Sequence, residues 1–269
     1  MSAKPLLKWA GGKSNLLLQL QPLFPTAFRT YFEPSVGAGA VFFSLNLKKL
    51  SFLSDANPEL MNVYEVVRQD PQALMRVLDE WAMCYSEEFF YSLRAADPSC
   101  AIERAAQFIF LNKTCFNGLY RQNSQGKFNV PFGKKEKCPT LYDKKNMLKA
   151  AQLLSRATLW TKDFEEVMSL AKKGDFIYCD PPYEPLSKTS SFNAYQGRGF
   201  SQADQVRLKE ACLKAQQRGV WVVVSNSSAP FIRELYGDYP VHSVQAKRAI
   251  NANAQQRGAI EEFAVLLRP

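Results

Sequence analysis

Asp180, Pro181, Pro182 and Tyr183 place an acid and an aromatic ring three positions apart in the chain. The apolar run at residues 176–179 before them predicts a short buried strand. The two prolines cannot continue a sheet ladder because they lack a backbone N–H. The sequence therefore predicts a stiff turn at the carboxyl end of a strand, which is where open α/β sheets bind ligands.

Such a turn suits an exocyclic amine on a flat base. A carboxylate or a backbone carbonyl can accept the protons of the amine, and a tyrosine ring can stack on the base. The alternative is a plain Pro-Pro turn with a surface acid, and four residues alone do not decide between the two. Residues 1–55 favour the ligand site, for the following reasons.

A strand predicted at residues 30–33 leads into a turn with Gly37 and Gly39 and then into a helix. Doubly wound sheets use this arrangement to bring backbone close to a nucleoside. The third glycine of the dinucleotide fingerprint is missing, so a pyrophosphate is not indicated. A second strand at residues 51–54 ends at Asp55, which could accept hydrogen bonds from ribose hydroxyls or could instead cap the next helix.

The N-terminal segment has two lysines, Lys8 and Lys13, and Trp9 around a pair of glycines. We predict that Ser14 caps a helix over residues 15–23. Groups of this kind at a helix start can hold a planar or charged ligand, although an ordinary Gly-Gly turn has the same pattern. The spacing does not match a phosphate-binding Walker A loop.

Composition points to an anionic partner. The 269 residues carry a net charge of +9, and 46% of them are hydrophobic, which supports a substantial core. Residues 113–149 hold nine Lys or Arg against two acids. A solvated surface can be this basic, but the asymmetry favours phosphate contact and hence nucleic acid.

Several function classes are disfavoured. No apolar stretch approaches the length of a membrane span, and the N-terminus lacks the apolar region of a signal peptide. The six cysteines are scattered, which is typical of reduced thiols in the cytoplasm. His242 is the one histidine, so a histidine zinc site or a Ser-His-Asp triad is not expected, and we expect no metal.

The remaining pattern alternates helices and strands around a helical insertion. Helices are predicted at 59–69, 72–83, 86–95, 101–116, 143–155, 164–172 and 202–217, the last capped by Ser201; strands are predicted at 157–161, 220–225, 239–246 and 261–267. Residues 119–130 predict a β-hairpin or long loop, and residues 184–200 predict a mobile flap. A basic loop with Lys247, Arg248 and Arg257 joins the last two strands.

Six motifs occur in the order found in Dam-type DNA adenine-N6 methyltransferases of the alpha class, the D12 family, which the chain resembles over most of its length. They are KWAGGK (8–13), FEPSVGAG (32–39), SDAN (54–57), NGLYRQN (117–123), FNVPFG (128–133) and YCDPPY (178–183). The resemblance implies an α/β fold, a Rossmann-like class-I methyltransferase sheet, with an inserted and mainly helical DNA-recognition domain that carries a β-hairpin. We expect residues 1–57 and 144–269 to form the S-adenosylmethionine-binding catalytic domain, and residues 58–143 the recognition domain.

The resemblance also implies an activity and site residues. It implies methyl transfer from S-adenosylmethionine to N6 of a flipped adenine in double-stranded DNA, within GATC. By matching position, Trp9, Ala10, Lys13, Glu33, Pro34, Gly37, Asp55 and Asp180 would bind the cofactor, and Asp180, Pro181 and Tyr183 would hold the adenine. Lys8, Phe116, Asn117, Leu119, Arg121, Asn123, Pro131, Lys134 and Lys135 would contact DNA.

Three residues depart from the family pattern. Lys134 and Lys135 stand where some relatives carry an aromatic phosphate contact, and Tyr120 stands where some have a smaller residue. Within the resemblance, Arg121 would read a guanine, which suits bidentate pairing to O6 and N7. Phe116 and Asn117 would wedge into the opened duplex.

Two rival functions stay open from the sequence. One is a methyltransferase of similar chemistry that acts on RNA or on a protein amide, and the basic insertion argues against the amide. The other is a DNA-binding relative with an inactive site, against which the intact acid, phenol and glycine turn argue. We expect a monomer that acts on double-stranded DNA in the cytoplasm, at a bacterial nucleoid or in a phage-infected cell.

Overall fold

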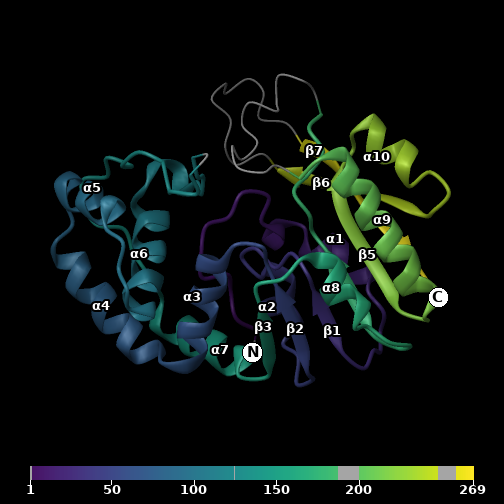
Figure 1. The fold of residues 1–269 in the computed structure, drawn as a ribbon, viewed down its shortest axis with the longest axis horizontal. Coiled ribbons are helices and arrows are strands. Elements are labelled where there is room, and N and C mark those ends of the chain that lie inside the picture. The colour runs from purple at the N-terminus through teal and green to yellow at the C-terminus, as the bar shows by residue number, and fades with distance from the viewer. Residues whose placement is uncertain (1, 124, 187–199, 248–258) are drawn as a thin grey trace.

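A computed structural model describes residues 2–123, 125–186, 200–247 and 259–269. Its centre is a seven-stranded sheet in the order β3-β2-β1-β4-β5-β7-β6 (Figure 1). The strands are β1 (Tyr31–Glu33), β2 (Ser51–Ser54), β3 (Ala157–Trp160), β4 (Phe176–Cys179), β5 (Trp221–Ser227), β6 (Val241–Lys247) and β7 (Ala259–Leu267). Strands β3, β2, β1, β4 and β5 run parallel, whereas β7 is antiparallel to both β5 and β6. This mixed α/β sheet confirms the predicted fold class.

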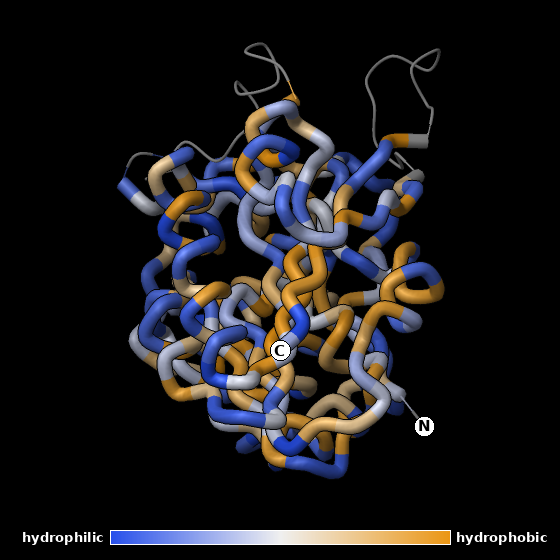
Figure 2. The backbone as a smooth tube through the Cα atoms, turned by 90° about the vertical axis from the view of Figure 1, so that its right-hand side faces the viewer, coloured by the Kyte–Doolittle hydropathy of each residue, from blue (hydrophilic) through white to orange (hydrophobic). Residues whose placement is uncertain are grey.

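Helices cover both faces of the sheet. Because successive side chains of a strand point to opposite faces, alternate residues of one strand belong to two different hydrophobic clusters. In β4, Phe176 and Tyr178 join the larger hydrophobic cluster, which includes residues of α2 (Ala40–Leu45), α3 (Pro58–Gln69) and α7 (Lys144–Leu154). Ile177 and Cys179 join the second cluster, with α8 (Phe164–Ser169), α9 (Gln202–Gln217) and α10 (Pro230–Leu235). Figure 2 shows hydrophobic segments gathered toward the middle of the molecule, with hydrophilic segments at the outer turns.

A group of helices lies beyond the β3 edge of the sheet (Figure 1). It comprises α3, α4 (Pro71–Met83), α5 (Glu87–Ala95) and α6 (Ala101–Thr114). Asn57, Asp70 and Ser86 cap α3, α4 and α5 by accepting backbone N–H hydrogen bonds, and prolines occupy the first position of α3 and α4. These local signals explain why four separate helices form here. The division of the chain into two domains stays a prediction.

The helix predicted at residues 15–23 was wrong as a single element. The chain forms a 3-10 turn at Lys13–Asn15, a short α1 at Leu17–Leu20 and a second 3-10 turn at Gln21–Leu23. Ser14 lies inside the first turn and is not a cap; Gly12 precedes it. Pro22 has no N–H to bond a preceding carbonyl, which explains why the α-helix stops at Leu20.

Other boundaries also differ from the predictions. Helix α6 ends at Thr114, two residues early, and α10 was not predicted. In the described part of 119–130, hairpin pairing is limited to an isolated bridge between Gln122 and Phe128, with no regular strand. The predicted flap falls mostly on residues 187–199, outside the described residues, as do Arg248 and Arg257. Among the described residues, no helix is both long and apolar enough to cross a bilayer.

Candidate active site

The turn after β4 lies at the centre of the sheet, since β4 pairs with β1 on one side and β5 on the other. All four strand residues are buried, and Asp180 follows at the carboxyl end. Pro181 is buried as well, whereas Pro182 is exposed. The acid and Tyr183 therefore emerge at the edge where the loops of a parallel sheet gather.

Lys13 links Asp180 and Tyr183. Its ammonium Nζ lies 3.0 Å from Asp180 Oδ1 and 4.6 Å from the centroid of the Tyr183 ring. The Lys13 side chain is only 3% exposed, and its Nζ also donates to the carbonyl of Gly11. An N–H donor thus occupies the space between a carboxylate and an aromatic face.

Burial raises the pKa of Asp180 to about 6, although the nearby Lys13 ammonium acts to lower it. The carboxylate of Glu262 contributes a further, smaller increase in that pKa. Asp180 Oδ1 is buried and, within the described residues, receives no hydrogen bond of good geometry besides the ion pair with Lys13. This oxygen can therefore accept a hydrogen bond from an incoming amine.

Glu262 on β7 fixes the other end of Tyr183. The Tyr183 hydroxyl donates to Glu262 Oε2 at 2.7 Å, and the same oxygen lies 3.9 Å from Lys13 Nζ. Burial and the charges of Asp180 and Glu262 raise the pKa of Tyr183 well above its usual value, so the phenol stays protonated and can donate. Sequence reasoning missed Glu262, although a charged residue beside the apolar run 263–267 was an available signal.

The glycine turn packs against the N-terminal segment. Gly37 has φ +48°, and a Cβ there would lie 2.9 Å from Nε1 of Trp9. The carbonyl of Gly37 accepts a hydrogen bond from the Tyr64 hydroxyl at 2.6 Å. Any side chain at Gly37 would fill the space beside Trp9, so the turn needs glycine both for its conformation and for this close approach.

Asp55 holds the same turn from β2. Its Oδ2 accepts from the Gly37 N–H at 3.0 Å, and its Oδ1 accepts from the Asn57 N–H at 3.0 Å. Asn57, not Asp55, caps α3, which rules out the capping alternative for the acid. Burial raises the pKa of Asp55, and these backbone N–H groups oppose the increase.

Glu33 lies deeper, at the end of β1. It accepts hydrogen bonds from the Tyr31 hydroxyl at 2.8 Å and from the Phe42 N–H at 3.1 Å, both through Oε2. Burial raises the pKa of Glu33 to about 8, while the bond from Tyr31 acts to lower it. Pro34 beside it is also buried. Glu33 thus ties β1 to the start of α2, below the glycine turn.

Apart from Lys8, the predicted DNA-contacting residues lie in the segment between the end of α6 and residue 135. The side chain of Asn112 joins α6 to the N-terminal segment: its Oδ1 accepts from the Lys8 N–H at 2.9 Å, and its Nδ2 donates to the Lys8 carbonyl at 2.8 Å. Trp9 stacks on Tyr120 with 5.2 Å between ring centroids, and Tyr120 stacks on Phe108 at 4.8 Å. Ala10 is exposed.

A match to a family model covers residues 9–250, and that model describes the D12 class N6 adenine-specific DNA methyltransferases. The chain belongs to this family. It is 40% identical over 279 residues to the Type II methyltransferase M.MjaIII of Methanocaldococcus jannaschii, covering 96% of each chain. It is 38% identical over 273 residues to the Type II methyltransferase M1.LlaDCHI of Lactococcus lactis subsp. cremoris (98% and 95% covered), and 35% identical over 271 residues to a Vibrio cholerae DNA adenine methylase (99% and 96% covered).

In this D12 methyltransferase, the loop predicted to read DNA is open to solvent. Phe116 is 51% exposed, and Asn117 beside it is exposed with φ +54°. Arg121 is exposed, and its Nε donates to Asn129 Oδ1 at 2.8 Å, while Asn123 Oδ1 accepts from the backbone of the Gln125–Lys127 turn. Phe116, Asn117 and Arg121 are therefore exposed to solvent, whereas Asn123 is half-buried and bonded within its own turn.

Positive charge gathers at the end of α6. The pKa of Lys113 is lowered to about 8, mostly by burial and in part by the nearby charges of Lys8 and Lys135. Lys134 and Lys135 are exposed, and Pro131, also exposed, accepts the Phe116 N–H through its carbonyl at 2.9 Å. Leu119 is half-buried. Lysines placed this close favour an anionic partner.

Proposed function

We propose that this enzyme transfers a methyl group from S-adenosylmethionine to N6 of an adenine flipped out of double-stranded DNA, within GATC. The observation that carries the proposal is the position of the Lys13 ammonium, 3.0 Å from the Asp180 carboxylate and 4.6 Å over the Tyr183 ring. A cation held between a carboxylate and a ring face marks a space suited to an amine on a planar base.

The residues around the glycine turn fit the expected cofactor. The Trp9 indole packs directly on Gly37, where a Cβ would clash with it. Asp55, which follows β2, accepts backbone N–H groups and has further lone pairs that could accept hydrogen bonds from ribose hydroxyls. Lys13, Asp55 and the backbone of Gly37 would hold the cofactor, with Ala10, Glu33 and Pro34 shaping the surrounding wall. When bound, S-adenosylmethionine supplies an activated methyl group, so the protein needs no covalent step of its own.

The protein's own groups hold and orient the base. A base inside a duplex is out of reach, so the adenine must leave the stack, which costs a few kcal/mol. Stacking on Tyr183 recovers about 1–3 kcal/mol of that cost. Asp180 and the carbonyl of Pro181 accept the N6 hydrogens, which orients the nitrogen lone pair toward the methyl donor and lowers the barrier by positioning.

The exposed loop would select the site. Arg121 would pair with a guanine through O6 and N7, and Phe116 with Asn117 would occupy the space left in the duplex. Lys8, Leu119, Asn123 and Pro131 would contact bases or backbone nearby. Lys134 and Lys135 would bind phosphate as point charges. One monomer embracing a duplex in the cytoplasm suffices for this scheme.

Purified protein with tritium-labelled S-adenosylmethionine tests the proposal directly. We expect label to enter a duplex with one GATC site, and not a duplex in which the target adenine is replaced or an RNA of the same sequence. Plasmid from adenine-methylation-deficient cells that express the protein should resist an endonuclease that cuts only unmethylated GATC. Label in RNA, or equal label in both duplexes, would contradict the substrate or the sequence assignment respectively.

A further inference from the structure

The turn that carries Tyr183 is held by side chains from two other elements. Pro181 and Pro182 offer no N–H for a ladder, so the backbone on both sides of Tyr183 needs partners elsewhere. Gln205 Nε2 on α9 donates to the Pro182 carbonyl at 2.9 Å. Asn226 Oδ1 on β5 accepts from the Glu184 N–H at 3.3 Å, and the Ser227 hydroxyl donates to the Glu184 carbonyl at 2.6 Å.

These bonds have one possible direction. The N–H groups of Glu184 and Ser227 can only donate, and both point at the same atom of Asn226, which must be its oxygen. The amide nitrogen of Asn226 then donates to Gln205 Oε1 at 2.9 Å. The nitrogen of Gln205 is left to donate to the Pro182 carbonyl, which can only accept. The side-chain amides of Asn226 and Gln205 therefore form a relay, a chain of hydrogen bonds with one fixed donor-to-acceptor direction that connects β5 to the turn.

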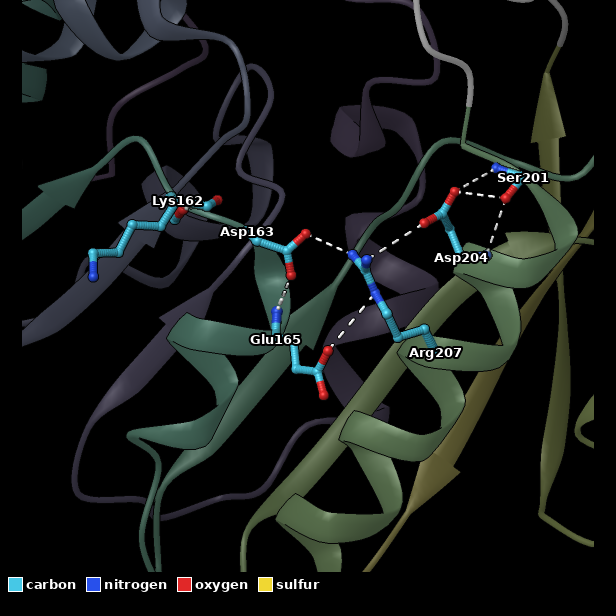
Figure 3. A network of polar contacts seen from close by, with 7 residues as sticks. Lys162, Asp163, Glu165, Ser201, Asp204 and Arg207 are labelled. Atoms are coloured by element: carbon cyan, nitrogen blue, oxygen red, sulfur yellow. Dashed lines mark hydrogen bonds and ion pairs between the residues drawn. The ribbon is translucent and has the colours of Figure 1, made fainter.

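Both amides are fully buried, at 0% exposure. Buried amides are unfavourable unless every group is bonded, so the pair holds its geometry strictly. The helix that carries Gln205 is itself anchored (Figure 3). Ser201 and Asp204 form a capping box at its start, and Arg207 bonds Asp163, which caps α8, at 2.6 Å.

We propose that Gln205 and Asn226 are positioning residues for methyl transfer, which fix the Tyr183 ring and the Asp180 carboxylate in register with the methyl donor. The inference rests on the proposed function of the turn. It implies that the rate of methyl transfer depends on two residues that lie outside the motif at residues 178–183 and do not contact the substrate. A misplacement of about 1 Å in such a site can cost on the order of 100-fold in rate.

Two substitutions test the relay. Gln205→Met conserves volume and removes both bonds. Asn226→Asp keeps the acceptor for Glu184 but removes the donor, so Gln205 must turn its nitrogen toward the new carboxylate and its oxygen toward the Pro182 carbonyl. We expect both variants to lose about 100-fold in kcat, with dissociation constants for S-adenosylmethionine and for a GATC duplex within about threefold of the wild type. The double variant should lose no more than the larger single loss, because both changes break one relay.

The exposed Gln217→Met on the same helix is the matched control, with expected wild-type kcat. Thermal unfolding of each variant sets a temperature at which all are folded. A kcat within threefold of the wild type in either variant overturns the proposal. So does a loss confined to cofactor or DNA affinity, which would make these residues part of a binding surface.

Hydrogen–deuterium exchange gives a readout that needs no activity. The amides of Tyr183, Glu184 and Leu186 should exchange faster in both variants than in the wild type and the Gln217→Met control. Exchange rates that stay unchanged in both variants would overturn the inference that Gln205 and Asn226 hold the turn at Tyr183. If the wild type transfers no methyl group to DNA, the proposed function fails, and faster exchange still supports the structural half of the inference.

Discussion

Replacement of Lys13 by methionine tests the electrostatics of the active site. The Lys13 ammonium lies 3.0 Å from Asp180 Oδ1, and the two side chains are 3% and 21% exposed. At an effective dielectric constant of about 20, unit charges at this separation attract by ~5 kcal/mol. Water entering the vacated space offsets part of that loss, and opposite charges at such distances shift a carboxyl pKa by about 1–3 units. We therefore expect the pKa of Asp180 to rise from about 6 by ~1–3 units in Lys13→Met.

The sign of the effect follows from the charge removed. Lys13 stabilises the ionised carboxylate and lowers the pKa of Asp180, so its loss raises that pKa. The wild-type carboxylate is mostly ionised at pH 7 and becomes protonated as the pH falls through about 6. A rise of ~1–3 units from about 6 gives a pKa of about 7–9, so the carboxyl of the variant should be at least half protonated at pH 7. Its single-turnover methylation rate should then be lower than that of the wild type at pH 7 and should recover toward pH 9, whereas the wild-type rate should fall only below about pH 6.

Carbon-13 NMR of protein labelled at the aspartate carboxyls measures this pKa without cofactor or DNA. Comparison with Asp180→Asn assigns the resonance. Lys162→Met, which removes an exposed ion pair with Glu166, is the matched control and should leave the pKa of Asp180 unchanged. A pKa that stays near 6 or falls in Lys13→Met would refute the ion pair as the dominant charge interaction.

Three further outcomes are expected. Glu262→Gln should lower the pKa of Asp180, because a negative charge that raises it is removed; the same titration measures this. Gly37→Ala should reduce the free energy of unfolding by ~1–2 kcal/mol in urea titrations, because φ is +48°, and should weaken S-adenosylmethionine binding in calorimetry because the methyl group presses on Trp9. Arg121→Ala should cost ~1–3 kcal/mol in discrimination at one guanine, measured with substituted duplexes; equal losses on all sequences would instead indicate a phosphate contact.

The parallel strands could be predicted closely from the sequence. Residues 176–179 form a short apolar run that ends at Asp180, and residues 51–54 end at Asp55; both strands were predicted to the residue. Parallel strands that are covered on both faces are rich in apolar residues, which makes runs such as residues 176–179 recognisable in the sequence. The prediction of one helix at residues 15–23 was wrong because it relied on the helical spacing of the apolar residues. Pro22, which interrupts the hydrogen bonding of a helix, was given too little weight.

The predicted site was incomplete for a different reason. Asp180 and Tyr183 belong to one turn, so their spacing could be recognised along the chain. Glu262 contacts Tyr183 across 79 residues, because β7 enters the sheet beside β5 in the reverse direction. No local pattern specifies that antiparallel insertion. The glycine turn was recognised, but its support by Tyr64 depends on how α3 packs, which sequence spacing does not show.

The geometry of the turn explains why the residues that hold it come from distant segments of the chain. Two consecutive prolines remove the N–H groups with which a loop usually ties itself to its own strand. The turn gains stiffness from the fixed φ angles, but its position must then be set by groups outside it. Gln205 and Asn226 supply backbone partners, Glu262 holds the phenol, and Lys13 holds the acid. These four residues come from four different segments of the chain. A substitution of any one of them should nevertheless disturb the same two groups, the Asp180 carboxylate and the Tyr183 ring.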